Sequence, residues 1–515
     1  MQRRAFTLGA AALAVAGTMA LSMNVAMAKD IAMTADVVVI GAGTAGTAAA
    51  LAAAETGAKV ITLEKKATVG GTGNFSEGIM AVESSMQRDW NYNLTKDQAF
   101  KMIMDYGHWR GDARMVRAFL EKTASTIDWM KSYGVKFEKL YSNYPGGLYT
   151  WHIYEGRGAG WINLFQKKYA EMGQKLLLET PAKSLIQKDG KIVGVVAEND
   201  DGDKITIKAG AVIIATGGFG ANPEMMKKYM RFPGVDGLAQ AGKTGDGILM
   251  AMQLGAGMVQ TGHCHMMHDF DSGPMASVPF MAVNMDGNRF MNEDMPFTMI
   301  NVQMRDQPKP GWFVQIYDGN YETTVPEMGF KATPADAVQK WMPEVEMDRS
   351  VASGNKVIEG LVDLYCADTL EELAEKIEVP ADALIASVER YNELVDAGFD
   401  EDFGKNPKYL KKIEQAPFWG ARKHIRVSAL CAGMTVNENY QVITTEGEVI
   451  PHLWATGFGA GQLCGAPDWS MYQSGMSAGH CFTSGRYTAI HAVTGGLEPS
   501  KPVMWEDIAD LVPEQ

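Results

Sequence analysis

Residues 35–65 read ADVVVIGAGTAGTAAALAAAETGAKVITLEK, and this stretch decides the fold class. An apolar run at 37–40 leads into Gly41-Ala42-Gly43-Thr44-Ala45-Gly46, an Ala-rich stretch follows, and a second β-branched run ends at Glu64. This strand–turn–helix–strand order is typical of a dinucleotide-binding unit, in which the first glycine permits a tight turn, the second lets the backbone approach a diphosphate and the third allows close helix–strand packing. The helix N-terminus offers N–H groups to the phosphates, and Glu64 is placed to accept hydrogen bonds from a ribose. The complete context disfavours the alternative, a Gly-rich turn without a ligand.

The first 28 residues predict an export signal. Arg3 and Arg4 precede an apolar stretch, and Ala26-Met27-Ala28 is a small-x-small cleavage site. Paired arginines are typical of the twin-arginine route. The alternative is an uncleaved membrane anchor, but the apolar stretch is interrupted and short for a span. We expect cleavage before Lys29, a periplasmic protein and no membrane span after cleavage. Because this route carries folded proteins, it favours tightly held FAD over diffusible NAD(P).

Composition narrows the classes of function. The chain has 515 residues, 46% hydrophobic and 21% charged, which indicates a globular protein of at least two domains. A net charge of −14 disfavours nucleic acid and anionic membranes as partners. None of the five cysteines lies in a CxxC or CxxCH pattern, so we expect neither an attached c-type haem nor a disulfide framework.

Residue composition and periodicity along the chain predict its domain organisation. Periodicity predicts helices at 96–106 and 112–133, a Gly/aromatic loop at 144–160, strands at 191–196, 204–208 and 211–214, and a helix that opens at 243–247. Residues 263–427 are rich in Met, Pro and charged helix, with expected helices at 370–384 and 385–397, and indicate an inserted domain. Gly-rich texture returns at 450–457, ahead of a last helix near 478–493. The expected division is a signal peptide 1–28, a nucleotide-binding domain in two parts (29–262 and 428–515), and a capping domain 263–427.

Six blocks in this order resemble the flavoprotein superfamily of fumarate reductase and succinate dehydrogenase, which includes urocanate reductase and 3-ketosteroid dehydrogenases. They are Gly41–Gly46 with Glu64, Gly70-Gly71-Thr72-Gly73, Ala215-Thr216-Gly217-Gly218-Phe219, Thr244-Gly245-Asp246-Gly247, residues 283–293 and Leu453-Trp454-Ala455-Thr456-Gly457. The resemblance implies an α/β fold, with a Rossmann-like FAD-binding domain and an inserted α+β capping domain. It also implies non-covalent FAD, because residues 71–78 lack the histidine that bonds the flavin in covalent members.

The resemblance assigns the expected FAD contacts to residues throughout the nucleotide-binding domain. They are Gly41, Gly43, Thr44, Ala45, Gly46, Glu64, Lys65, Gly71, Thr72, Gly73, Gly78, Ala215, Thr216, Gly217, Asp246, Gly457, Ser474 and Met476.

Departures from the family pattern concern the substrate. Counted from Asn292-Glu293, the position of the fumarate reductase arginine acid falls on Phe297. Ala429 stands where that family has a substrate-binding histidine, and a third cation, an arginine, is missing from residues 465–475. Loss of these cations removes the charge-assisted hydrogen bonds that a C4 dicarboxylate needs. We therefore expect a more aromatic and less cationic pocket in which fumarate is not the substrate.

A protein acid is still needed to protonate the substrate carbon while flavin delivers hydride. The candidates are Tyr472 in the C-terminal substrate loop, His268 or His265, Arg426, and His152 in the 144–160 loop. For each of them a packing or surface role is the alternative.

Three further interpretations concern a possible metal site, the cap and a possible aromatic contact to the substrate. His263, His265 and His268, with Cys264 and Asp269, could also form a metal site, although no second ligand cluster supports one. Arg289 is expected to buttress the cap, and Trp469 could stack on a ring substrate.

The leading hypothesis is an exported reductase of an activated C=C bond in an enoate, an aromatic-conjugated substrate or an enone. Its electrons would come from a periplasmic c-type cytochrome or FMN-carrying protein. One alternative is a ketosteroid-dehydrogenase-like enzyme that introduces a C=C bond next to a carbonyl. A second alternative is a non-catalytic flavin electron carrier, which an inserted cap disfavours.

Overall fold

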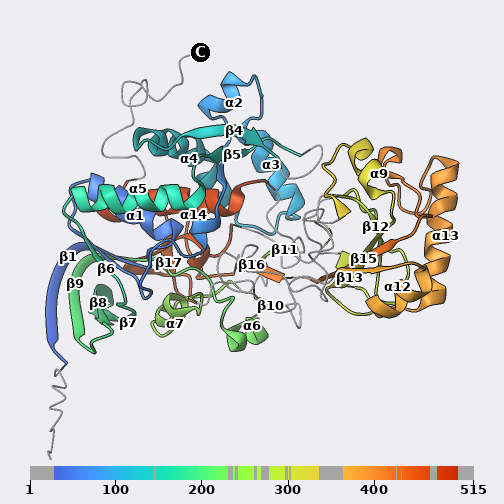
Figure 1. Ribbon diagram of the computed structural model, residues 1–515. Helices are drawn as coiled ribbons and strands as arrows, with labels where there is room; N and C mark the ends of the chain where they lie inside the picture. Colours follow the sequence, from blue (N-terminus) through green and yellow to red (C-terminus); the bar gives the residue numbers. More distant parts are fainter. Residues whose placement is uncertain are drawn as a thin grey trace, which may run out of the picture.

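A computed structural model of the chain (Figure 1) describes the backbone of residues 28–142, 147–229, 236–237, 242–259, 264–267, 278–295, 300, 303–304, 306–335, 364–424, 426–430, 432–463 and 473–496, and their side chains except at 236–237, 264–267 and 424–430. An eight-stranded sheet organises the larger part, and a four-stranded antiparallel sheet the smaller one. No helix in the described ranges has the length and apolar character of a membrane span. Residues 1–27 of the predicted signal peptide lie outside the described residues.

The eight-stranded sheet combines both ends of the chain. Its order is β17-β18-β9-β1-β2-β6, with β7 and β8 attached through β9. β18, β9, β1, β2 and β6 run parallel, whereas β7, β8 and β17 pair antiparallel. The bounds are β1 (Asp30–Ile40), β2 (Val60–Leu63), β6 (Lys175–Leu177), β7 (Ala182–Lys188), β8 (Lys191–Glu198), β9 (Lys204–Ile214), β17 (Gln441–Ile443) and β18 (Val449–Ala455).

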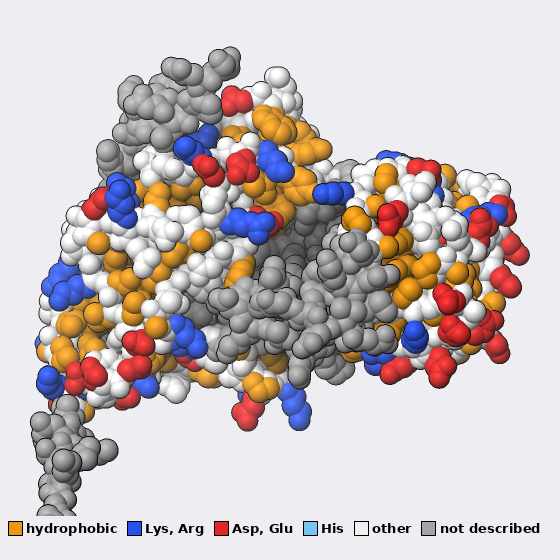
Figure 2. All heavy atoms as spheres, viewed as in Figure 1, with side chains coloured by type: hydrophobic (Ala, Val, Ile, Leu, Met, Phe, Trp, Pro, Cys, Tyr) orange, Lys and Arg blue, Asp and Glu red, His pale blue; other side chains and the backbone are white. Residues whose placement is uncertain are grey.

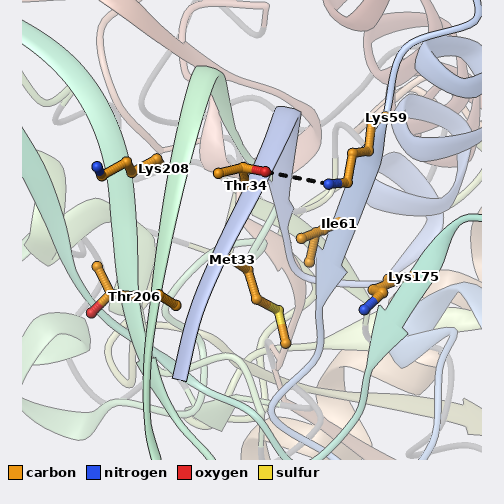
Figure 3. A pocket seen from close by; sticks show the side chains of 8 residues that line it. Met33, Thr34, Lys59, Ile61, Lys175, Thr206 and Lys208 are labelled. Atoms are coloured by element: carbon orange, nitrogen blue, oxygen red, sulfur yellow. Dashed lines mark hydrogen bonds between the residues drawn. The ribbon is translucent and has the colours of Figure 1, made fainter. Parts of the chain in front are cut away.

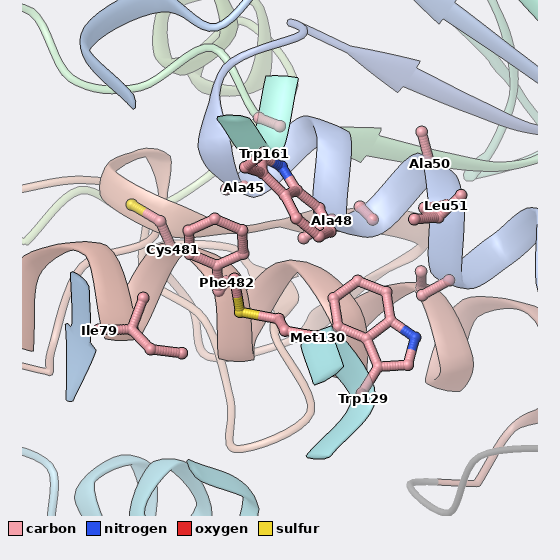
Figure 4. Close-up of a cluster of buried hydrophobic side chains, with 14 of the residues drawn as sticks. Ala45, Ala48, Ala50, Leu51, Ile79, Trp129, Met130, Trp161, Cys481 and Phe482 are labelled. Carbon is pink, nitrogen blue, oxygen red and sulfur yellow. The ribbon is translucent and has the colours of Figure 1, made fainter. Parts of the chain in front are cut away.

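Helices α1 (Thr44–Glu55), α5 (Arg157–Glu171) and α14 (Met476–Thr494) cover one face of this sheet (Figure 1). Seven of the twelve residues of α1 are alanine, because the helix is buried on several sides and small side chains let α14 approach it. At their crossing an added Cβ on Gly485 would overlap the carbonyl oxygen of Ala45. Trp161, Trp129 and Phe482 fill the surrounding core (Figure 4).

The remaining elements of the larger part flank this layer. They are α2 (Ser85–Asp89), α3 (Lys96–Tyr106), α4 (Ala113–Ser132), α6 (Pro223–Tyr229), α7 (Asp246–Met252), a sheet of β3 (Gly78–Met80), β5 (Trp151–Tyr154) and β4 (Phe137–Tyr141), and the short helices η1 (Gly71–Phe75) and η4 (Gly457–Gly459). A third small sheet, β10 (Asp236–Gly237), β16 (Arg426–Leu430) and β11 (Cys264–Met267), lies on the side of the smaller part.

The smaller part is the cap. Its sheet runs β12 (Met281–Val283), β13 (Trp312–Tyr317), β15 (Phe418–His424), β14 (Leu364–Ala367), with α9 (Tyr321–Met328), α12 (Leu370–Ile377) and α13 (Ala381–Ala397) around it, and the short helix η3 (Pro407–Tyr409) follows. In Figure 2 acidic side chains gather on its outer face, over α12 and α13.

Several predicted boundaries were wrong. The expected loop at 144–160 contains β5 and the first turn of α5, because β5 is formed by pairing with the nearby β4 and with β3, which is distant in sequence. The helix break expected at 384–385 lies instead at 378–380, where Glu378 adopts φ 60° and Pro380 caps α13. The strands expected at 204–208 and 211–214 are one strand, β9, and β1 begins seven residues before the apolar run at 37–40.

Candidate active site

The turn after β1 contains three glycines, and the structural reason for a glycine differs among the three positions. Gly41 has φ +102°, and an added Cβ there would lie 2.7 Å from the carbonyl oxygen of Ala215, while a Cβ on Gly46 would overlap the carbonyl oxygen of Gly41. Packing therefore requires these two glycines. Gly43 has an ordinary φ of −77°, and an added Cβ would meet nothing nearer than the Gly70 carbonyl oxygen at 3.9 Å. The protein's own packing does not explain Gly43, whereas the approach of a diphosphate does.

The N-terminus of α1 faces the same turn. Gly43 is its N-cap, no side chain caps it, and the first helical hydrogen bond runs from Thr47 N to Gly43 O over 2.9 Å. The N–H groups of the first turn have no acceptor within the helix and are available to phosphate oxygens.

The second Gly-rich block packs directly on the first. The N–H of Gly70 donates to Ala42 O over 2.8 Å, and an added Cβ on Gly73 would overlap Thr44 Oγ1. Thr72 Oγ1 is buried and has no hydrogen-bond partner in the described part of the chain. A buried hydroxyl in this position is a candidate cofactor contact.

Glu64 and Asp246 lie at the carboxyl edge of the sheet. Glu64 accepts hydrogen bonds from the N–H of Ala42 (2.8 Å, Oε2) and of Lys66 (2.9 Å, Oε1). Lys65 Nζ donates to Asp246 Oδ2 (2.7 Å) and Thr244 Oγ1 (2.6 Å). Each carboxylate oxygen of Glu64 retains acceptor capacity for a ribose hydroxyl.

The turns after β9 and β18 complete the arrangement, because β9 lies between β1 and β18. An added Cβ on Gly457 would lie 2.7 Å from Ala45 Cβ. Thr216 Oγ1 is buried and finds no hydrogen-bond partner within the described ranges. We call the space bounded by the turns 41–46, 70–73, 215–217 and 457–459 the cofactor cleft.

The start of α14 lies beside β3. The N–H of Met80 donates to Gly475 O (2.9 Å), and Thr150 Oγ1 donates to Ser474 O (3.0 Å). Gly475 is the N-cap of α14 and no side chain caps the helix, so the N-terminal N–H groups next to Met476 remain available. Gln473, which was not predicted, is 3% exposed, and among the residues that the structure describes both polar atoms of its amide lack a hydrogen-bond partner. No pattern around Gln473 would have identified it.

Gly78 joins the second Gly-rich block to β5. It pairs with Ile153, and an added Cβ would overlap the carbonyl oxygen of His152. The expected FAD contacts thus come together from segments distant in sequence.

His152 is held by its neighbours on both sides of the ring. Nε2 lies 2.6 Å from Ser84 Oγ, and Nδ1 lies 2.9 Å from the carbonyl oxygen of Thr150. The side chain is fully buried, and burial lowers its pKa to about 4 despite the hydrogen bond to Thr150. A neutral ring of this kind, donating to Thr150 and accepting from Ser84, fits the packing alternative for His152 better than the role of acid.

The other acid candidates are placed less fully. Tyr472, His268, Phe297 and Trp469 lie outside the described residues. The backbone of Arg426 pairs with Met267, and the backbone of Ala429 with His265. The pairing of β11 with β16 thereby places the backbone of the histidine-containing segment beside the backbone of the segment that contains Arg426 and Ala429. The candidate metal cluster at 263–269 also lies largely outside the description, and no group of three possible ligands is found in the described part.

Arg289 buttresses the cap, as expected. It donates to Glu293 (2.9 Å, Nε to Oε1) and Asp400 (2.7 Å, Nη2 to Oδ2), and Lys405 Nζ lies 3.3 Å from Glu293 Oε2. Burial alone would raise the pKa of both carboxyls. Lys405 and Arg289 instead lower the pKa of Glu293. Arg289 and backbone N–H groups lower the pKa of Asp400 to about 2. The four charges cancel within the cluster.

A separate groove of about 370 Å³ lies on the sheet near the starts of its strands (Figure 3). It is lined by Lys59, Lys175 and Lys208 above Ile61 and Met33, and Lys59 donates to Thr34 Oγ1 over 3.3 Å. Because the Gly-rich turns follow the other ends of β1, β2 and β9, this groove is not part of the cofactor cleft.

Comparison with known proteins agrees with this geometry. Residues 36–466 match the family model of the FAD binding domain. The chain belongs to this family. It is 33% identical over 487 residues to a vinyl phenol reductase of Lactiplantibacillus plantarum, covering 88% of this chain and 96% of that protein. It is 30% identical to a urocanate reductase of Eggerthella lenta, covering 83% and 70% of the two chains.

Among solved structures, the open conformation of a flavocytochrome c3 fumarate reductase superposes with a TM-score of 0.69 at 25% identity, covering 90% and 79% of the two chains. The fold is therefore α/β, with an FAD-binding and a capping domain. The chain is an FAD-dependent oxidoreductase that acts on C=C bonds.

The residues of the cofactor cleft fit FAD. Within the described part of the chain, no atom lies closer than 3.9 Å to an added Cβ on Gly43, no side chain caps the N–H groups at the N-terminus of α1, and the buried hydroxyls of Thr72 and Thr216 have no hydrogen-bond partner.

Proposed function

We propose that this protein reduces a C=C bond conjugated to an aromatic ring, with non-covalently bound FAD and with the vinyl phenols as the leading substrate class. The observation that carries the proposal is the lack of three cations that the fumarate reductase pattern has: Phe297 and Ala429 stand at two of their positions, and the third, an arginine, is missing from residues 465–475. A neutral aromatic alkene needs no such clamp. Similarity to a vinyl phenol reductase over 96% of that protein supports the same class.

In the cofactor cleft, Glu64 would hold the ribose, the N-terminus of α1 the diphosphate, and the N-terminus of α14 the flavin ring. Bound and reduced, FAD supplies the hydride. Residues 71–78 contain no histidine, which supports non-covalent binding.

The chain must supply the proton that completes the saturated carbon. Tyr472 is the first candidate for this donor, because it lies in the C-terminal substrate loop, from which the arginine of the fumarate reductase pattern is missing. His268, His265 and Arg426 belong to strands or segments around β11 and β16, whose backbones pair, and they are the other candidates for binding the polar end of the substrate. His152 would position β5 through Ser84 rather than move a proton.

The proposed setting is the periplasm, after export by the twin-arginine route. The electrons would come from a c-type cytochrome or an FMN-carrying protein, since the chain has no CxxCH motif for a haem of its own.

The test is anaerobic reoxidation of the dithionite-reduced holoprotein, followed at the flavin absorbance band. The panel contains 4-vinylphenol, a cinnamate, urocanate, fumarate and a steroid enone. Rapid reoxidation by 4-vinylphenol with fumarate inert is expected, and Tyr472→Phe should slow it while Tyr365→Phe, on β14 of the cap, should not. Turnover of fumarate would overturn the interpretation of Phe297 and Ala429. Reduction of oxidised flavin by a saturated ketone, with no reoxidation by the alkenes, would replace the proposal by a dehydrogenase.

A further inference from the structure

Lys243 stands directly before the Thr244-Gly245-Asp246-Gly247 motif and is not among the predicted cofactor or catalytic residues. Its carbonyl oxygen accepts from the N–H of Ala221 over 2.9 Å, which ties its backbone to the segment that follows β9. The preceding Gly242 packs on Lys65 and Lys66, since an added Cβ would lie 3.6 and 3.4 Å from their Cε atoms. Lys243 therefore starts from the wall of the cofactor cleft next to Glu64 and Asp246.

The side chain of Lys243 runs into the cleft. Its Cγ lies 3.9 Å from the position of an added Cβ on Gly217, and its ammonium interacts electrostatically with Cys481 of α14. Cys481 in turn borders the turn after β18, because its Sγ lies 3.4 Å from an added Cβ on Gly457, whose neighbour across the cleft is Ala45 of α1. Figure 4 shows Cys481 and Ala45 on adjoining ends of α14 and α1. The side chain of Lys243 thus lies against the turn after β9, and its charge acts on Cys481 beside the turn after β18.

This position is where the carboxyl edge of a parallel sheet receives the phosphates of a dinucleotide. Burial lowers the pKa of Lys243 to about 8, which Cys481 offsets only in part. The thiol is neutral, because burial raises the pKa of Cys481 to about 12 although Lys243 opposes the shift. Lys243 is half-buried, and a partly desolvated ammonium at this place is stabilised by an anionic ligand in the cleft.

We propose that the ammonium group of Lys243 binds the diphosphate of FAD, as the side-chain cation that complements the N-terminus of α1. The proposal rests on the placement of FAD in the cofactor cleft. A lysine acts on phosphate as a point charge, so it can follow either phosphate group without a fixed geometry. Exchange for arginine should retain part of the binding, whereas exchange for methionine should lose it.

The experiment compares apoprotein of the wild type with Lys243→Met and Lys243→Arg, and with Lys227→Met on the exposed face of α6 as matched control. Affinity for FAD is measured by flavin fluorescence, and affinity for ADP by competition. A charge-assisted hydrogen bond of about 1.5–3 kcal/mol corresponds to a loss of roughly 10- to 150-fold. We expect K243M to lose FAD and ADP by a similar factor in this range, K243R to lose less, and K227M to be unchanged.

Two further readouts separate this role from a structural one. Calorimetry at pH 8.5 in two buffers of different ionisation enthalpy should show proton uptake when wild type binds FAD, and none for K243M, because a bound diphosphate would raise the pKa of the amine. The melting temperature of apo K243M should equal or exceed that of the wild type. Wild-type affinity of K243M for both ligands, or a lower melting temperature of its apoprotein with unchanged affinity, would overturn the proposal.

Loss of FAD without loss of ADP would move the contact to the flavin half and also overturn the proposal. Gly43→Val serves as the control for the cleft itself. If G43V binds FAD like the wild type, the placement of FAD fails; if G43V loses FAD and K243M does not, only the role of Lys243 fails.

Discussion

Exchange of Glu64 for glutamine tests the cofactor cleft through its most defined geometry. The two carboxylate oxygens accept from two different backbone N–H groups, those of Ala42 and Lys66. Glutamine has one acceptor oxygen, so its NH₂ group must face one of these donors. Loss of one hydrogen bond to a charged group costs about 1.5–3 kcal/mol. Because both bonds exist without cofactor, this cost should appear in the urea unfolding of the apoprotein.

Loss of the expected ribose contact should appear separately, in the affinity for FAD. A second hydrogen bond to the carboxylate is worth about 1.5–3 kcal/mol, which raises Kd roughly 10- to 150-fold. Flavin fluorescence titration measures this change, and Glu198→Gln is the control, since Glu198 is exposed and only 3.7 Å from Lys183 in a surface ion pair. If E64Q destabilises the apoprotein but binds FAD normally, Glu64 only ties the turn together. If neither quantity changes, the reasoning from both hydrogen bonds is refuted.

Three further predictions concern stability. Arg289→Met leaves Glu293 and Asp400 buried without their shared partner and should lower the free energy of unfolding by about 3–5 kcal/mol. Amide exchange should become faster in β13 and β15 of the cap and stay unchanged in β1, and unchanged exchange in the cap would contradict the cluster's role. Burial lowers the pKa of His480 to about 4 in the folded chain, so between pH 6.5 and 4 only the unfolded chain takes up a proton at this residue. The free energy of unfolding should therefore fall by roughly 3 kcal/mol as the pH drops through this window. His480→Phe, packed by Phe119 and Phe458, should flatten this dependence in urea unfolding, and a slope as steep as that of the wild type would disprove the assignment. Gly46→Ala should unfold at lower urea than Gly43→Ala, because only the first places a Cβ on the Gly41 carbonyl oxygen, and equal midpoints would contradict this distinction.

The part of the fold that could be predicted is the part whose signals are local. The turn after β1 is recognisable because its glycines form one short motif between an apolar run and a helix, and because Gly46 packs on Gly41 five positions before it, although Gly41 itself packs on the distant Ala215. The start of β1 was missed because residues 30–36 alternate in exposure and lack a continuous apolar run. The break at Pro380 carried a local signal, since a proline disfavours helix at the residue before it.

The rest depends on contacts between distant segments. Residues 144–160 carry turn-forming glycines and aromatics, yet Trp151–Tyr154 becomes a strand because β3 and β4 flank it. His152 looked like a loop residue for the same reason, and its partner Ser84 lies 68 positions earlier. Lys243 reaches the cleft only because β9 and β18 are neighbours, which no periodicity in either segment reveals.

The topology also gives a physical reason for the expected route of export. β1 and α1 come from the start of the chain, whereas β18 and α14 come from its end, and β9 joins them in one sheet. The turns after β1 and β18 touch across the cofactor cleft through Ala45 and Gly457. FAD can therefore be enclosed only after the whole chain has been made and folded. A leader of the twin-arginine type suits such a protein, because threading an unfolded chain through a membrane would separate the two halves of the cleft and leave the cofactor behind.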